Sequence, residues 1–383
     1  MEQQTIFDIL YPKFKIDKPI RLIELFSGYG SQALALKYLG VKFEHWKTCE
    51  WAVKSIQAYK DLHFTDDDIE LNPGRTKEEM IEFLYQKGIS ADYNKPMTKE
   101  QIKRLSEDQL KTIIKNIAIT HNLVNIQQVK GADLEIKDTD YFTYLLTYSF
   151  PCQDLSLAGK GKGMSDTSTR SGLLWEVERI LTECEHKPQV LLMENVPQVH
   201  SQDNMKDFYK WQVRLEELGY KNYWQDLIAT DYGIPQIRNR CFMVSILGDY
   251  SYTFPKPIPL KLKLKDMLET NVDKKYYLTE KMVQGMINTN FYQYQLENRL
   301  QDVGGVIDTL TTSTGERAPH VIMDIPRLAI KNATSLGYLE AEVGDGIDIS
   351  SRMEYHRGTV QKGKSQTITT MGGEDVGVLI NEC

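Results

Sequence analysis

Three segments of the chain hold side chains that can do covalent and acid–base chemistry together. Cys152 follows the apolar run 141–148, so it stands at the carboxyl end of a predicted buried strand. Glu194 ends a second apolar run, and Arg238 and Arg240 follow further along the chain. A thiolate is a strong nucleophile, a carboxyl group can carry a proton, and a guanidinium can bridge a carbonyl and a carboxylate. This set can activate a pyrimidine ring.

A glycine loop between the first predicted strand and the first predicted helix suits a ligand with an adenosine group. Gly28 and Gly30 let the backbone come close to a bound molecule. Glu50 ends the next predicted strand, where a carboxylate can accept hydrogen bonds from ribose hydroxyls. Trp51 follows and can stack on an adenine, although a tryptophan here is also a natural core residue. Because the loop has no Walker-type lysine, a triphosphate is not expected.

Strand and helix patterns alternate from about residue 20 to 248 and predict an α/β fold with a doubly wound, Rossmann-like sheet. The insertion 65–125 interrupts this alternation with charged helices that start near Thr76, Thr98 and Ser106, and we expect it to be a solvated lid or spacer. The predicted strands are 21–26, 42–48, 126–129, 141–148, 190–193, 223–229 and 241–247, and the other predicted helices are 32–39, 172–185 and 205–218.

The composition changes after residue 250. The proline-rich stretch 255–259 is typical of a linker. Beyond Asp302, short threonine-rich segments alternate with glycines, and the segment 309–316 is repeated as 367–374. We therefore predict two domains, a larger one at 1–250 and a smaller β-rich one at 251–383.

Composition excludes several classes of protein. With 41% hydrophobic residues the chain can bury a core, and it has no apolar stretch of membrane-spanning length and no signal peptide, which predicts a cytoplasmic protein. The five cysteines lack paired spacing, which argues against a metal site or a disulfide framework. The net charge of −7 weighs mildly against nucleic acid, but local basic patches decide that question.

Four ordered motifs resemble those of the DNA cytosine-C5 methyltransferases. They are the segments 24–30, 150–153, 194–196 and 236–240, and the glycine-rich stretch 158–174 resembles that family's mobile catalytic loop. The resemblance covers roughly residues 20 to 248, apart from the insertion. It implies a methyltransferase domain, S-adenosylmethionine as cofactor, and a target-recognition domain after residue 250.

The resemblance also assigns roles to residues. The catalytic set would be Cys152, Glu194, Arg238 and Arg240, and Lys160, Lys162 and Arg170 would contact DNA phosphates. The cofactor would be lined by Phe26, Gly28, Gly30, Glu50, Trp51, Asp133, Pro151 and Leu174, although an aspartate before a strand, such as Asp133, can equally serve a turn.

The implied reaction methylates C5 of cytosine in double-stranded DNA, in restriction–modification or in phage protection. Addition of the Cys152 thiolate to C6 makes C5 nucleophilic, and protonated Glu194 near N3 offsets the charge that develops. The base must flip out of the duplex, because C6 is hidden in the stack.

The chain also departs from the family pattern. Ser31 and Ser149 replace glycines of the usual motifs, and no Gln-x-Gly-Asn-Ser segment follows the second β repeat. This leaves open a non-catalytic or partner-dependent DNA-binding subunit, and we expect the chain either to pair with a second polypeptide that supplies the missing motif or to be a truncated form. An RNA cytosine methyltransferase would need a Cys-Phe-Thr signature, which is absent. A nicotinamide-dependent dehydrogenase would explain Gly28, Gly30 and Glu50 but not the later motifs.

Overall fold

The computed structural model describes residues 12–65, 74–151, 171–274, 277, 279 and 300–309, together with short strands between 321 and 378. Cys152, Lys160, Lys162 and Arg170 lie outside these residues, as does most of the repeat at 309–316 and 367–374. The chain forms two compact units. The first contains residues 1–227 and 239–256, and the second contains 228–238 and 257–383.

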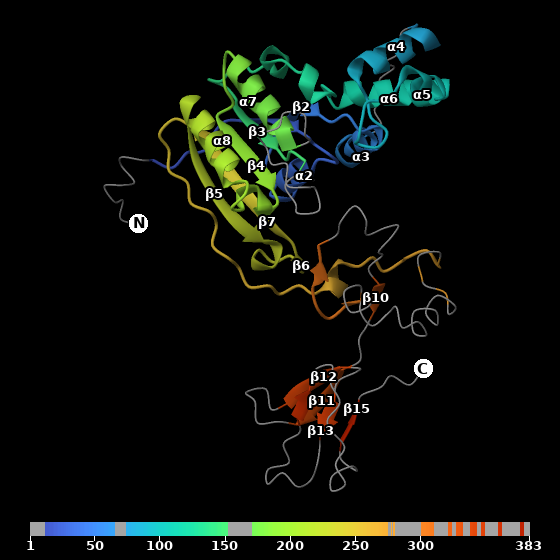
Figure 1. Ribbon diagram of the computed structural model, residues 1–383, viewed down its shortest axis with the longest axis vertical. Coiled ribbons are helices and arrows are strands. Elements are labelled where there is room, and N and C mark those ends of the chain that lie inside the picture. The colour runs from blue at the N-terminus through green and yellow to red at the C-terminus, as the bar shows by residue number, and fades with distance from the viewer. Residues whose placement is uncertain are drawn as a thin grey trace. The chain divides into compact units, whose positions relative to one another are not determined.

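A six-stranded sheet is the centre of the first unit (Figure 1), and its strand order is β2-β1-β3-β4-β7-β5. The strands β2, β1, β3 and β4 are parallel, whereas β7 runs antiparallel to β4. The carboxyl ends of the parallel strands therefore share one edge with the start of β7. The strands are β1 (Ile20–Leu25), β2 (Phe43–Cys49), β3 (Thr143–Tyr148), β4 (Val190–Asn195), β5 (Tyr220–Ile228) and β7 (Asn239–Leu247).

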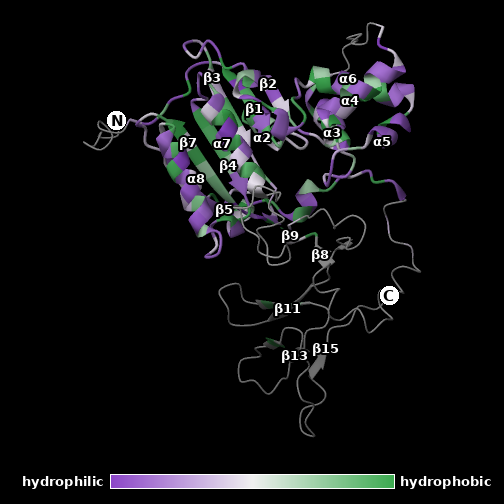
Figure 2. Ribbon diagram, turned by 45° about the horizontal axis from the view of Figure 1, so that its top comes forward, coloured by the Kyte–Doolittle hydropathy of each residue, from purple (hydrophilic) through white to green (hydrophobic). Residues whose placement is uncertain are grey.

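Both faces of this sheet are buried. Successive side chains of a strand point to opposite faces, so each strand contributes to two apolar cores. On one face, Ile23 and Leu25 of β1 pack with helices α7 (Leu174–Glu183) and α8 (Met205–Glu217). On the other face, Ile20 and Leu22 pack with α2 (Ser31–Tyr38) and nearby aromatic side chains. In Figure 2 the central strands are largely green, whereas much of the helix surface is purple. The observed architecture confirms the α/β prediction.

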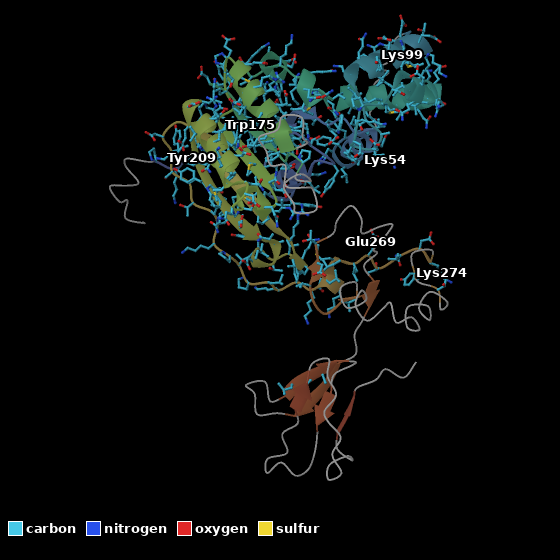
Figure 3. All side chains as sticks on the ribbon, in the orientation of Figure 1. Lys54, Lys99, Trp175, Tyr209, Glu269 and Lys274 are labelled. Atoms are coloured by element: carbon cyan, nitrogen blue, oxygen red, sulfur yellow. The ribbon has the colours of Figure 1, made fainter. Side chains whose placement is uncertain are left out.

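The insertion folds around a core of its own. Its helices α4 (Lys77–Lys87), α5 (Lys99–Lys103) and α6 (Glu107–Ile119) gather beside α3 (Val53–His63) in Figure 1. Capping boxes at Thr76, Thr98 and Ser106 fix the three predicted helix starts. The buried side chains include Met80, Leu84, Ile89, Ile102, Leu110 and Ile114, together with Ile56 of α3. The insertion is therefore a packed body and not only a set of solvated helices, although polar side chains such as Lys99 cover the outer surface (Figure 3). Its role as a lid or spacer stays a prediction.

The predicted strand at 126–129 was also wrong. Residues Ile126–Gln128 form a short 3-10 helix, and a second one follows at Gly131–Leu134. The Asn125 side chain accepts a hydrogen bond from the backbone N–H of Gln127, which turns the chain at this point. Ile126 and Val129 are nevertheless buried, so the apolar pattern marked burial and not a strand.

The second unit contains short strands of two to five residues in its described part. β6 (Gln236–Ile237) pairs with β9 (Ile307–Asp308), and β8 (Leu300–Asp302) pairs with β10 (Val321–Met323). Three further pairings join β11 (Arg327–Lys331) to β12 (Tyr338–Glu342), and β13 (Gly346–Asp348) to β14 (Thr359–Gln361) and β15 (Val376–Val378). Among the helices in the described part of the chain, none is long and apolar enough to cross a membrane.

Candidate active site

The glycine loop at the carboxyl end of β1 turns sharply into α2. Phe26, Gly28 and Gly30 have φ values of 57°, 55° and 83°, in the left-handed region that glycine adopts without strain. A Cβ on Gly30 would lie within 2.5 Å of side-chain atoms of both Tyr59 and His63. Gly30 is therefore required by close packing as well as by its backbone conformation.

Glu50 is held rigidly beside this loop. Its Oε2 accepts a hydrogen bond from the Gly28 N–H at 3.1 Å, and its Oε1 accepts one from the Ala52 N–H at 2.8 Å. Only 8% of the residue is exposed, and burial raises the pKa of Glu50. The carboxylate is thus oriented at the sheet edge and retains lone pairs that can accept further hydrogen bonds.

Asn122 fixes the backbone of Glu50 and is a residue that sequence reasoning missed. Its Oδ1 accepts from the Glu50 N–H at 3.0 Å, and its Nδ2 donates to the Glu50 carbonyl at 3.0 Å. The same Oδ1 accepts from the Val124 N–H at 2.8 Å. No local pattern identifies Asn122, because it lies 72 residues from its partner, near the end of the insertion.

A second buried carboxylate lies under the loop. Glu24 accepts hydrogen bonds from the Tyr59 hydroxyl at 2.5 Å and from the Ala33 N–H of α2 at 3.3 Å. The Tyr59 oxygen also lies 2.8 Å from Nδ1 of His45. Burial outweighs these hydrogen bonds and raises the pKa of Glu24 to about 7. The start of α2 is therefore tied to a carboxyl group that titrates near neutral pH.

Glu194 and Arg240 form an ion pair at the same edge of the sheet. The Nε of Arg240 lies 3.0 Å from Oε1 of Glu194, and the two side chains are 17% and 19% exposed. Glu194 stands near the end of β4, opposite Phe242 of β7, so the antiparallel register brings Arg240 to it. The structure thus joins two of the four predicted catalytic residues.

Asn195 connects this pair to the segment that leads into Cys152. Its Nδ2 donates to the carbonyl of Phe150 at 3.1 Å, and its Oδ1 accepts from the Val196 N–H at 2.8 Å. Asn195 is only 3% exposed and Phe150 is equally buried. β3 and β4 are adjacent and parallel, so their carboxyl ends are neighbours. Glu194 lies near the end of β4, and the residues just before Cys152 follow the end of β3.

The other predicted site residues that the structure describes make the following contacts. Asp133 is exposed, and its carboxylate accepts from the Lys130 N–H at 2.8 Å within its own turn. Leu174 is wholly buried in the core at the start of α7. Trp51 packs against the core of the insertion. Arg238 lies in the second unit, where its carbonyl accepts from the Ala229 N–H at 2.9 Å.

Comparison with known proteins decides the family. The model of the C-5 cytosine-specific DNA methylase family matches residues 87–369. The chain belongs to this family. It is a DNA (cytosine-5-)-methyltransferase, and its methyl donor is S-adenosylmethionine.

Two bacterial proteins are similar to the methylase over most of their length. The type II methyltransferase M2.ScrFI of Lactococcus lactis subsp. cremoris is 36% identical over 283 residues, which are 73% of this chain and 76% of the relative. The orphan methyltransferase M.SssI of Spiroplasma monobiae is 35% identical over 317 residues, or 77% and 80% of the two chains.

A solved structure supports the fold alone. The Entamoeba histolytica methyltransferase EhMeth has a TM-score of 0.51 to the methylase at 15% sequence identity, and the match covers 81% of this chain and 77% of that one.

The first unit of the methylase fits its methyl donor. S-adenosylmethionine carries ribose hydroxyls, which donate hydrogen bonds, and an adenine ring that needs an apolar wall. Glu50 offers a buried, fixed carboxylate beside a loop whose glycines admit close approach. Partly buried Trp51 follows Glu50 directly in the chain.

Proposed function

We propose that this methyltransferase modifies cytosine in double-stranded DNA by covalent catalysis with Cys152 as nucleophile. The thiolate adds to C6 of the ring, and Glu194 supplies a proton near N3 as charge develops there. Arg240 holds the Glu194 carboxyl group, and Arg238 is proposed to contact the base carbonyl. S-adenosylmethionine supplies a methyl group activated by its sulfonium charge. A base then removes the C5 proton, and elimination of the thiol restores the aromatic ring.

One observation carries this proposal. Asn195 binds the Phe150 carbonyl through its amide, while its neighbour Glu194 pairs with Arg240. A carboxyl group, a guanidinium and the segment that leads into Cys152 therefore belong to one hydrogen-bonded arrangement at the sheet edge. The proposal extends to base flipping, because a duplex hides C6 from any thiolate, and to phosphate contacts by Lys160, Lys162 and Arg170.

Cofactor contacts are proposed on the same basis. Glu50 would accept hydrogen bonds from the ribose and Trp51 would contact the adenine, with Phe26, Gly28 and Gly30 shaping the loop. Pro151, Leu174 and Asp133 complete the proposed set, and Asp133 has the weakest support because its carboxylate already closes a turn. A role in restriction–modification or phage protection is proposed, since M2.ScrFI is named a type II methyltransferase.

A trapping experiment tests the covalent step. DNA that contains 5-fluorocytosine should form a stable adduct with the wild-type protein and S-adenosylmethionine, because fluorine at C5 blocks the final proton removal. Cys152→Ala should give no adduct, while Cys184→Ser, which changes a buried cysteine at the end of α7, should still give one. An adduct that survives in Cys152→Ala contradicts the assignment.

The second polypeptide stays a prediction, and it is tested separately. If the chain needs a partner, the purified protein alone should bind DNA but transfer methyl groups very slowly. Turnover of about 1 per second or faster, which is ordinary for enzymes, would contradict the need for a partner.

A further inference from the structure

Three side chains that can bind a metal ion, His200, Asp226 and Cys241, lie close to the Glu194–Arg240 ion pair. His200 ends the 3-10 helix η5 (Pro197–His200), Asp226 lies on β5, and Cys241 lies on β7. Nε2 of His200 is 2.9 Å from Oδ1 and 3.1 Å from Oδ2 of Asp226. One ligand atom from each of the three side chains lies within 4.8 Å of the other two.

We propose that His200, Asp226 and Cys241 bind a divalent transition metal of the zinc class. Imidazole nitrogen, carboxylate oxygen and thiolate sulfur are the donors that zinc takes in proteins, and three protein ligands with one water form an open tetrahedral site. Bond lengths of about 2.0–2.3 Å place such donors roughly 3.3–3.7 Å apart. To reach that geometry the His200–Asp226 pair must open from 2.9 Å, and any separation in the trio that is near the 4.8 Å limit must shorten.

The surroundings favour an ion at this position. The His200 ring packs against Trp224 with ring centroids 4.8 Å apart and against Phe208 at 6.1 Å, which orients the imidazole. Cys241 is fully buried, whereas the side chains of His200 and Asp226 are 20% and 32% exposed, so an ion can enter from their side.

The charges of the site also balance. Metal binding replaces the thiol proton of Cys241, which passes to solvent, and the thiolate and the Asp226 carboxylate together match a 2+ ion. Glu194 is not needed for this balance, because Arg240 already neutralises it.

The site would connect the elements around the catalytic pair. Cys241 follows Arg240 directly and lies opposite Asn195 in the β4–β7 register, and η5 follows β4 after one residue. A metal bound to η5, β5 and β7 would therefore hold the edge of the sheet on which Glu194 and Arg240 lie. This effect on catalysis rests on the proposed function, but the metal binding itself does not.

Cobalt binding gives a direct test. Full-length protein is freed of metal with a chelator and titrated with Co²⁺, whose bond to a thiolate gives an intense near-ultraviolet charge-transfer band. A Cys152→Ser background excludes the thiol proposed as nucleophile. We expect about one equivalent of Co²⁺, with the band present in the background protein and in its Cys184→Ser control. Zn²⁺ should displace Co²⁺ and abolish the band.

The variants decide between a metal site and a hydrogen-bonded trio. Cys241→Ser should lose the band, and His200→Gln and Asp226→Asn should each weaken Co²⁺ binding at least roughly tenfold. A band that persists in Cys241→Ser, or substoichiometric binding to the background protein, would overturn the proposal. If Cys241→Ser does not fold by circular dichroism, the partly exposed His200→Gln still decides, and unchanged affinity there overturns it. None of these readouts requires methyl transfer, so they remain valid if the proposed function fails.

Discussion

One substitution can distinguish a proton-transfer role of Glu194 from a structural role in its ion pair with Arg240. Glu194→Gln keeps an oxygen that can accept from the Arg240 Nε, so the fold should be retained. The amide carries no acidic proton, so methyl transfer should fall by about 10²–10⁴-fold. Transfer of a radiolabelled methyl group to DNA measures the effect, with circular dichroism and DNA binding as controls. Activity within a few-fold of wild type would remove Glu194 from the acid role.

Glu50 and Asn122 give a second residue-level prediction. Glu50→Ala should weaken S-adenosylmethionine binding by about 1–3 kcal/mol, because it removes the proposed acceptor and leaves the Gly28 and Ala52 N–H groups without it. Asn122→Ala should weaken binding in the same direction by releasing the Glu50 backbone. Isothermal titration calorimetry measures both, and Asn94→Ala in an exposed turn of the insertion is the control. Equal affinity of Glu50→Ala and wild type would contradict the ribose assignment.

Glu24 should make stability depend on pH. Its pKa is raised from the usual 4.5 to about 7, so the folded protein holds this proton more tightly than the unfolded chain. The contribution of Glu24 is full below about pH 4.5, is lost as pH rises through about 7, and has an upper size of about 3 kcal/mol. Urea unfolding at several pH values should show wild type losing stability relative to Glu24→Gln between those limits. A constant difference from pH 4.5 to 8 would contradict the raised pKa.

The site residues that were predicted from the sequence stand in recognisable local patterns, whereas the residues that were missed depend on partners far away in the chain. Glu50 was placed by a strand pattern that ends at it, and its fixed position beside the glycine loop confirms that reading of the strand. Asn122 and Tyr59 carry no such pattern, because their partners Glu50 and Glu24 lie far away in the sequence. Asp133 matched a motif by composition, yet its carboxylate serves a local turn.

At the scale of elements, helix starts were the most predictable feature of the insertion. Ser106 and Thr98 each begin a capping box, and a polar cap followed by a Gln three residues later is visible in the sequence. The packing of the insertion was not visible, because the charged residues that dominate its composition lie outside a buried stripe. The prediction at 126–129 failed for a related reason, since two apolar residues in a four-residue run cannot distinguish a strand from a buried turn.

The insertion core should therefore matter for stability. Leu110 is wholly buried in α6, so Leu110→Ala should lower the free energy of unfolding by about 2–5 kcal/mol. Lys99→Ala removes only an exposed ion pair with Glu82 and should cost less than about 1 kcal/mol. Denaturant unfolding compares the two variants. Similar free energies of unfolding for the two variants would contradict a stabilising role for the insertion core.

At the scale of the whole molecule, the boundary between the units is not a single point in the sequence. The sequence placed 228–238 with the first domain, but the contacts place it with the second unit. Three backbone or side-chain hydrogen bonds show why. The backbone carbonyls of the segment are the acceptors. The Ile258 N–H donates to the carbonyl of Asp231, the Ile307 N–H donates to that of Pro235, and the Thr309 hydroxyl donates to that of Ile237. These contacts join positions tens of residues apart, which a composition shift near residue 250 cannot reveal.

This arrangement sharpens a prediction about DNA sequence recognition. If the second unit selects the target, replacing both 228–238 and 257–383 with the equivalent parts of a relative should transfer its site preference. Replacing 257–383 alone should give a less stable protein, because the new region must pair with the old 228–238 segment at β6 and at the Tyr232–Ile258 bridge. Bisulfite mapping of DNA from expressing cells reads the methylated motif, and thermal unfolding reads stability.

Arg238 lies inside the exchanged segment, so both chimaeras should retain an arginine at that position. An unchanged motif in the double exchange would place sequence selection in the first unit, and equal stability of both chimaeras would show that 228–238 folds independently of the rest of the second unit.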